Sequence, residues 1–168
     1  MRLQPVDKQR YRQRLNRITV LSILALLVIS LASSTLLISL FATGSGSNFW
    51  LNLSGVVIGC LVVGFSLKRL RSRPYFAEVA YIWDLKHELN LIQRKLRAIQ
   101  AAAEQNDATA LLILAFSYAG SRLIWQLDDN TLMMSELNLA DNKLQEQISG
   151  LGLKLDLDTY RRELLARF

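Results

Sequence analysis

The sequence predicts an all-α membrane protein, in which an N-terminal two-helix transmembrane hairpin precedes a cytoplasmic bundle of about four helices. Two observations predict the hairpin: residues 18–46 and 47–67 contain no charged side chain, and every Lys, Arg, Asp and Glu lies outside them. A third predicts the bundle, because apolar residues after position 74 recur at helical spacing. The predicted parts are a basic cytoplasmic segment (1–17), the hairpin (18–67), a basic juxtamembrane segment (68–73) and a helical cytoplasmic domain (74–168).

The first apolar run, residues 18–43, is long enough to cross a bilayer, whose core needs about 20 apolar residues as a helix. A cleaved signal peptide is the alternative, since a basic segment precedes the run. Its apolar region would span only about 7–15 residues, so the length favours a retained anchor.

The second run, residues 49–67, has the minimum length for a span and contains one strongly polar residue, Asn52. Small residues four apart let membrane helices approach closely. The predicted helix-packing positions are Gly55 and Gly59 in this run, with Ser30 and Ser34 as a weaker counterpart in the first. They serve either to pack the hairpin or to form a weak homodimer.

The orientation follows from the placement of charge. Cytoplasmic flanks of membrane helices are enriched in Lys and Arg, and the turn predicted at 43–48 has no charge. Both termini are therefore expected in the cytoplasm. Anionic lipid headgroups are the expected partners of the basic side chains in the two flanks: Arg10, Arg12, Arg14, Arg17, Lys68, Arg69, Arg71 and Arg73.

The segment 74–104 begins with proline and then contains no glycine or proline, which predicts one long helix. An apolar seam with alternating spacings of three and four runs along it, and the charged residues, Glu88 among them, fall off the seam. The members of the seam are Ile82, Leu85, Leu89, Ile92, Leu96 and Ile99.

The following segment, residues 108–127, predicts a buried central helix. Its uncharged part ends at Ser121 and is too short for a third span. Asn106 or Asp107 is the expected N-cap. The segment 128–130 is expected to cap the next helix, which Gly150 and Gly152 would end, and Asp156 or Asp158 is expected to cap a last helix reaching Arg167.

The chain contains no motif for catalytic, cofactor-binding or metal-binding residues. His87 is the single histidine, and the position four residues later is Leu91, so the zinc-protease spacing is incomplete. No cofactor and no enzymatic activity are expected. The excess of basic residues borders the apolar runs and not the helical domain, which argues against nucleic-acid binding. A weaker prediction is a ligand pocket around Trp83, Tyr118, Arg122 and Trp125, with Arg122 paired to Asp128 or Asp129.

Four stretches resemble an uncharacterised domain-of-unknown-function family of small proteobacterial inner-membrane proteins. They are RYRQRLNR (10–17), GSNFWLNLSGVVIG (46–59), PYFAEVAYIWDLKHELN (74–90) and AFSYAGSRLIWQLDDNT (115–131). The resemblance covers nearly the whole chain. It implies two membrane helices, a helical cytoplasmic part and a bacterial inner (cytoplasmic) membrane. It implies no activity.

The sequence therefore favours a non-enzymatic inner-membrane interaction protein that presents a helical cytoplasmic domain. Its expected partners are the lipid bilayer and either a protein or a second copy of the chain. The alternatives are an accessory subunit of a membrane transport or envelope-assembly complex, and a ligand sensor on the cytoplasmic side.

Overall fold

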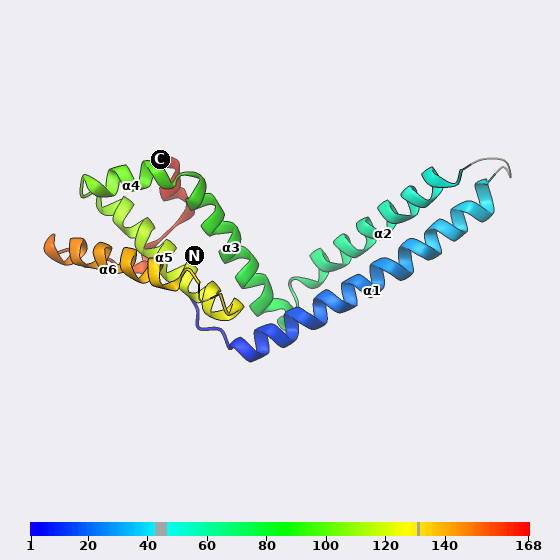
Figure 1. The fold of residues 1–168 in the computed structure, drawn as a ribbon, viewed down its shortest axis with the longest axis horizontal. Helices are drawn as coiled ribbons and strands as arrows, with labels where there is room; N and C mark the ends of the chain where they lie inside the picture. The colour runs from blue at the N-terminus through cyan, green and yellow to red at the C-terminus, as the bar shows by residue number, and fades with distance from the viewer. Residues whose placement is uncertain (43–46, 131) are drawn as a thin grey trace. The chain divides into compact units, whose positions relative to one another are not determined.

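A computed structural model describes residues 1–42, 47–130 and 132–168, and it confirms the all-α class for this part of the chain, which contains no strand. The predicted turn at 43–48 lies mostly outside the described residues. The helices follow one another along the chain as Figure 1 shows. They are α1 (Lys8–Phe41), α2 (Phe49–Leu70), the 3-10 turn η1 (Pro74–Phe76), α3 (Ala77–Arg94), α4 (Leu96–Glu104), α5 (Ala108–Asp128), α6 (Met134–Gly150), and the 3-10 segments η2 (Leu157–Thr159) and η3 (Arg162–Arg167).

The chain forms two compact units. The helical domain combines Met1–Lys8 with Tyr81–Phe168, and the hairpin unit is Gln9–Ala80. The first eight residues thus belong with the domain, although α1 starts among them. The boundaries predicted from the sequence group residues 1–17 separately, and they stay predictions.

In the hairpin unit, α1 and α2 run antiparallel and side by side (Figure 1). Their large apolar side chains, such as Leu31, Leu61 and Phe65, are mostly exposed within the structure. Exposure of this kind over two whole helices is not found on soluble domains, which keep exposed apolar patches small. Their length and composition make both helices candidate membrane spans.

Among the described residues, three helices are long and apolar enough to cross a membrane, one more than the sequence predicted: α1, α2 and α5. Burial separates them. Only 6% of the most apolar stretch of α1 and 11% of that of α2 are buried, whereas 50% of that of α5 is buried inside the structure. The apolar side chains of α5 are thus largely covered by protein, as expected for a central core helix.

The core of the helical domain is built around α5, which packs against α4, α6 and η2. Gly120 lets α3 cross α5 closely, because a Cβ atom there would lie 3.2–3.3 Å from the side chains of Leu89 and Leu85. Four seam residues of α3 and α4, Ile82, Leu85, Ile92 and Ile99, are fully buried. The seam therefore faces the domain's own core.

The single helix predicted for 74–104 is wrong, because the helix is interrupted at Lys95. This residue has φ −110° and ψ 8°, and its amide bonds the carbonyl of Ile92 in a 3-10 turn. The side chain of Lys95 donates to the carbonyl of Leu165 at 2.7 Å. Beyond the break, Ile99 and Ala103 of α4 are buried.

The predicted helix ends are partly confirmed. Asp107 caps α5, its carboxylate accepting hydrogen bonds from the amides of Thr109 and Ala110. Asp128–Asn130 do not cap α6, since Asp129 takes a left-handed conformation that ends α5, and α6 begins after Met133 without a side-chain cap. The predicted last helix is also wrong: two 3-10 segments, η2 and η3, replace it.

Candidate functional site

The glycines of α2 pack on the serines of α1. A Cβ atom on Gly55 would lie 2.1 Å from the Ser34 hydroxyl oxygen, and one on Gly59 would lie 2.3 Å from that of Ser30. The Ser34 hydroxyl donates to the carbonyl of Asn52 at 3.2 Å. This geometry supplies close helix contact within one chain, and so favours hairpin packing over dimerisation as the use of these small residues.

An apolar groove, here called the hairpin groove, lies between α1 and α2 on the side of these contacts that leads to η1. Its volume is about 390 Å³. Small side chains at Ser22, Ala25 and Ser66 leave the space open, and the Ser66 hydroxyl donates to the carbonyl of Val62 within its own helix. The residues that line the groove are Ile18, Leu21, Ser22, Ala25, Ile29, Val63, Ser66, Leu67, Leu70, Tyr75 and Phe76.

Aromatic and charged side chains fix one end of the hairpin groove. The Arg14 guanidinium lies 5.2 Å from the centre of the Tyr75 ring, within cation–π range, and its Nη1 is 3.3 Å from a carboxylate oxygen of Glu78. Arg10 also contacts Glu78, at 3.4 Å. Glu78 thus offsets part of the positive charge at this end and holds Arg14 against a residue of the groove.

The helical domain contains one buried carboxylate among its described residues, Glu88, which is 2% exposed. One oxygen accepts a hydrogen bond from the Tyr160 hydroxyl at 2.7 Å. The other accepts two from the Arg162 guanidinium, at 2.8 Å from Nε and 2.5 Å from Nη2. Buried charges occur in proteins when they are paired and hydrogen bonded, and Glu88 meets both conditions.

The pKa of Tyr160 is raised well above its usual value, first by burial and second by its hydrogen bond to Glu88. The pKa of Arg162 is raised chiefly by its hydrogen bond to the same carboxylate. Tyr160 also stacks on Phe116 of α5, with ring centres 3.9 Å apart. The cluster therefore ties the C-terminal segment to both α3 and α5.

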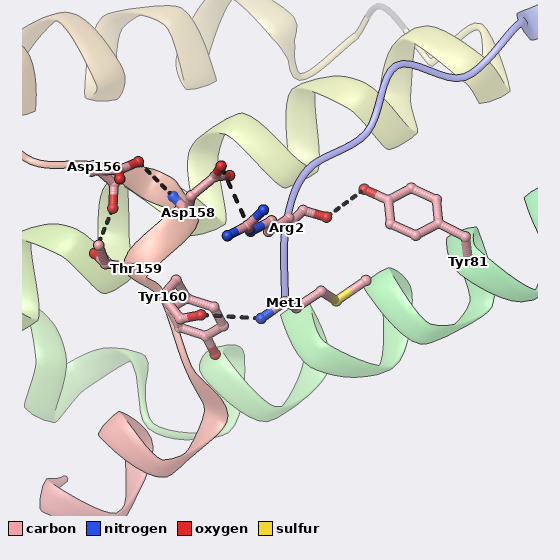
Figure 2. A network of polar contacts seen from close by, with 7 residues as sticks. All are labelled: Met1, Arg2, Tyr81, Asp156, Asp158, Thr159 and Tyr160. Atoms are coloured by element: carbon pink, nitrogen blue, oxygen red, sulfur yellow. Dashed lines mark hydrogen bonds and ion pairs between the residues drawn. The ribbon is translucent and has the colours of Figure 1, made fainter.

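The N-terminal residues lie against the same segment (Figure 2). The Met1 α-amino group donates to the carbonyl of Tyr160 at 3.0 Å, and Arg2 lies 3.7 Å from Asp158. The Tyr81 hydroxyl accepts from the amide of Gln4 and donates to the carbonyl of Arg2. The segment before α1 is thereby held on the helical domain.

The four residues of the predicted ligand pocket lie on α3 and α5. Trp83 is exposed, while Tyr118, Arg122 and Trp125 are half-buried. A shallow hollow between α4, α5 and α6 includes Tyr118 and none of the other three. The pocket stays a prediction.

The pairing predicted for Arg122 is wrong. Its guanidinium binds Asp141 of α6 at 2.6 Å and Asn138 at 3.2 Å. The two aspartates predicted as its partners are held elsewhere, Asp128 by Lys86 at 2.7 Å and Asp129 by Lys8. Arg122 therefore fastens α6 to α5.

In the part of the chain that the structure describes, no three His, Cys, Asp or Glu side chains gather in a way that could hold a metal ion. Sequence reasoning missed the Glu88 cluster and the hairpin groove. The groove had a signal, since Ser22, Ala25 and Ser66 are small residues among large apolar ones. Glu88 had none, because its partners are more than 70 positions away.

One family model matches nearly the whole chain, over residues 1–165. Its description is "Protein of unknown function (DUF3087)". The chain belongs to this family. No curated protein and no solved structure matches the chain. The resemblance noted in the sequence, to a family of unknown function, is thereby confirmed, and membership in DUF3087 supplies no activity for the residues described above.

Proposed function

We propose that this DUF3087 member is a non-enzymatic protein of the bacterial inner membrane, anchored by α1 and α2, that presents its helical domain to a protein partner in the cytoplasm. The observation that carries the anchor is the contrast in burial. α1 and α2 leave their apolar side chains uncovered by protein, while α5 buries half of its most apolar stretch. Hydrocarbon is the surrounding that suits the first two helices.

The charge pattern supports the orientation. Arg12 and Arg17 lie in the first turns of α1, and Lys68 and Arg69 lie in the last turn of α2. Placed in a bilayer, the antiparallel hairpin brings both clusters to one membrane face. Such clusters favour the cytoplasmic face and the anionic lipid headgroups there.

A protein partner is supported by apolar side chains that α6 and the turn before it leave exposed. Leu132, in the turn before α6, is 87% exposed, and Leu139 on α6 is 59% exposed. Met133 and Leu151 are exposed as well. Apolar residues that gather on a surface commonly mark a protein contact.

Reporter fusions test the anchor and its orientation. Alkaline phosphatase fused after Ser47 should be active, because the enzyme matures only outside the cytoplasm, and fusions after Arg73 and after Phe168 should be inactive. An active fusion at Phe168 would contradict the two-span topology.

Purification in mild detergent tests the partner. A protein that co-purifies with wild type, and is lost in the Leu132→Glu and Leu139→Glu double variant, supports the proposed surface. Glu146→Ala, an exposed position on the same helix, is the matched control. Recovery of a large polytopic membrane protein would indicate an accessory-subunit role, and an unchanged set of proteins in the double variant would remove the surface from the proposal.

A further inference from the structure

We propose that the hairpin groove binds one acyl chain of an anionic phospholipid from the cytoplasmic leaflet, with the lipid phosphate held by basic side chains at the end of the groove. The inference rests on the proposed membrane anchor, because a lipid can enter only if α1 and α2 lie in a bilayer. It adds a ligand of stated chemistry to that anchor.

The register of the two helices makes the groove. Gly55 lies opposite Ser34 and Gly59 opposite Ser30, which draws the helices together. Further toward η1 the facing residues include Ser22, Ala25 and Ser66. These side chains are too small to fill the space between the helices, while Ile18, Leu21 and Leu67 form its walls.

The size and the lining of the groove specify an apolar occupant. Its volume of about 390 Å³ falls in the range of roughly 300–1,000 Å³ that is usual for small-molecule sites. Protein interiors tolerate few voids larger than a water molecule, and an apolar hollow of this size offers water almost no hydrogen-bond partner. An acyl chain is the apolar molecule that a bilayer supplies.

Charge at the end of the groove selects an anionic lipid. Arg17 precedes Ile18, and Lys68 and Arg69 follow Leu67, so basic residues adjoin groove residues on both helices. Arg17, Lys68, Arg69 and Arg73 are exposed and make no ion pair with other described residues. Arg14, in contrast, is held by Glu78. The exposed cations remain available to a phosphate.

The occupant is a lipid chain and not a helix of a second copy. A helix with its side chains is about 10–12 Å across. The surface of Gly55 and Gly59, where a second helix could approach closely, is already covered by Ser30 and Ser34 of the same chain. The groove accepts something narrow, flexible and apolar, attached to a negative charge.

Native mass spectrometry of the full-length protein in mild detergent tests the inference. Phosphatidylglycerol and phosphatidylcholine with identical acyl chains are titrated separately, and the apparent Kd of the first bound lipid is measured. We expect one phosphatidylglycerol to bind at least about tenfold more tightly than phosphatidylcholine. Equal binding of the two lipids would overturn the assignment of an anionic ligand.

Matched variants place the lipid. Ala25→Phe fills the groove, whereas Ala32→Phe adds the same ring at an exposed position of α1. Ser66→Leu and Gly64→Leu form a second pair on α2, where a Cβ atom at Gly64 meets nothing within 4 Å. The groove variants should raise the apparent Kd for phosphatidylglycerol at least about tenfold, and the control variants should raise it less than about twofold. Helical content by circular dichroism must match wild type for each variant compared.

Equal effects of the groove and control variants would overturn the inference, as would wild-type protein that binds no single lipid or forms a dimer sealed through Ala25. The fusion results separate this failure from failure of the anchor. The lipid site alone is ruled out if the fusions report two spans and the groove variants bind phosphatidylglycerol like wild type. The proposed anchor itself is ruled out if the fusions report another topology.

Discussion

Truncation of the buried carboxylate, Glu88→Ala, should loosen the C-terminal segment from the helical domain. The Tyr160 hydroxyl is fully buried and donates to Glu88 at 2.7 Å. In the variant this donor has no acceptor, which costs roughly 1–3 kcal/mol. Loss of the one buried methylene, Cγ, adds roughly 0.8 kcal/mol. Relief of the desolvated charge offsets part of the loss, because burying a carboxylate is itself unfavourable.

The net loss in the free energy of opening is about 2–3 kcal/mol, which corresponds to a roughly 30- to 150-fold faster amide exchange in the segments that Glu88 joins. Arg162 contributes little to this figure, since its side chain is 58% exposed and returns to water. Glu88→Gln retains an acceptor for Tyr160 and should lose only about 1 kcal/mol.

Hydrogen exchange of the full-length protein in mild detergent, followed by mass spectrometry, measures the effect in peptides from α3 and from residues 157–167. Glu146→Ala, at an exposed position of α6, is the control and should change the amide exchange rate by less than about threefold. Adding Tyr160→Phe to Glu88→Ala removes the orphaned hydroxyl and should restore part of the protection. The reasoning about the buried cluster is wrong if the amides of Glu88→Ala exchange at the wild-type rate. It is also wrong if the two substitutions together speed amide exchange by the product of their separate effects.

Three further predictions concern Tyr160, the cap of α5 and the packing of the hairpin. The pKa of Tyr160 is raised in the folded state above its usual 10.0, so its contribution to stability is complete below pH 10 and is lost as pH rises further; the alkaline decline in Tm should be shallower in Tyr160→Phe. Asp107→Ala removes the cap of α5 and should lower the free energy of unfolding by about 1 kcal/mol in urea titrations, whereas an unchanged midpoint would mean that the cap adds nothing. Gly59→Leu should separate α1 from α2 by a few ångströms in spin-label distance measurements, because Ser30 occupies the space. Gly64→Leu, which faces open space, should not; equal distances in the two variants would contradict the packing of Gly59.

The sequence predicted features that depend on local patterns. Uncharged runs of sufficient length identified α1 and α2, and the apolar seam identified the buried face of α3. Asn106 and Asp107 were the two predicted caps of α5. The cap is Asp107, whose hydrogen bonds reach only two and three residues ahead. These signals lie within one or two helical turns. A single sequence displays them directly.

Features that depend on distant residues were missed. Glu88 lies off the apolar seam, so the pattern predicted an exposed charge, and only Tyr160 and Arg162 from the far end of the chain make its burial possible. The segment 128–130 is typical of a helix N-cap, but within it Asp129 ends α5 and pairs with Lys8. The break at Lys95 likewise depends on tertiary packing that no propensity reveals.

Cysteine labelling in spheroplasts with an intact inner membrane tests the central claim most directly. The protein's single cysteine, Cys60, is first changed to alanine. In that background Ser47→Cys, between the hairpin helices, should react with a membrane-impermeant maleimide added outside spheroplasts. Ser135→Cys, exposed on α6, should react only after the membrane is permeabilised. Labelling of Ser135→Cys from outside would show that α5 crosses the membrane as a third span, and would contradict an anchor made of α1 and α2 alone.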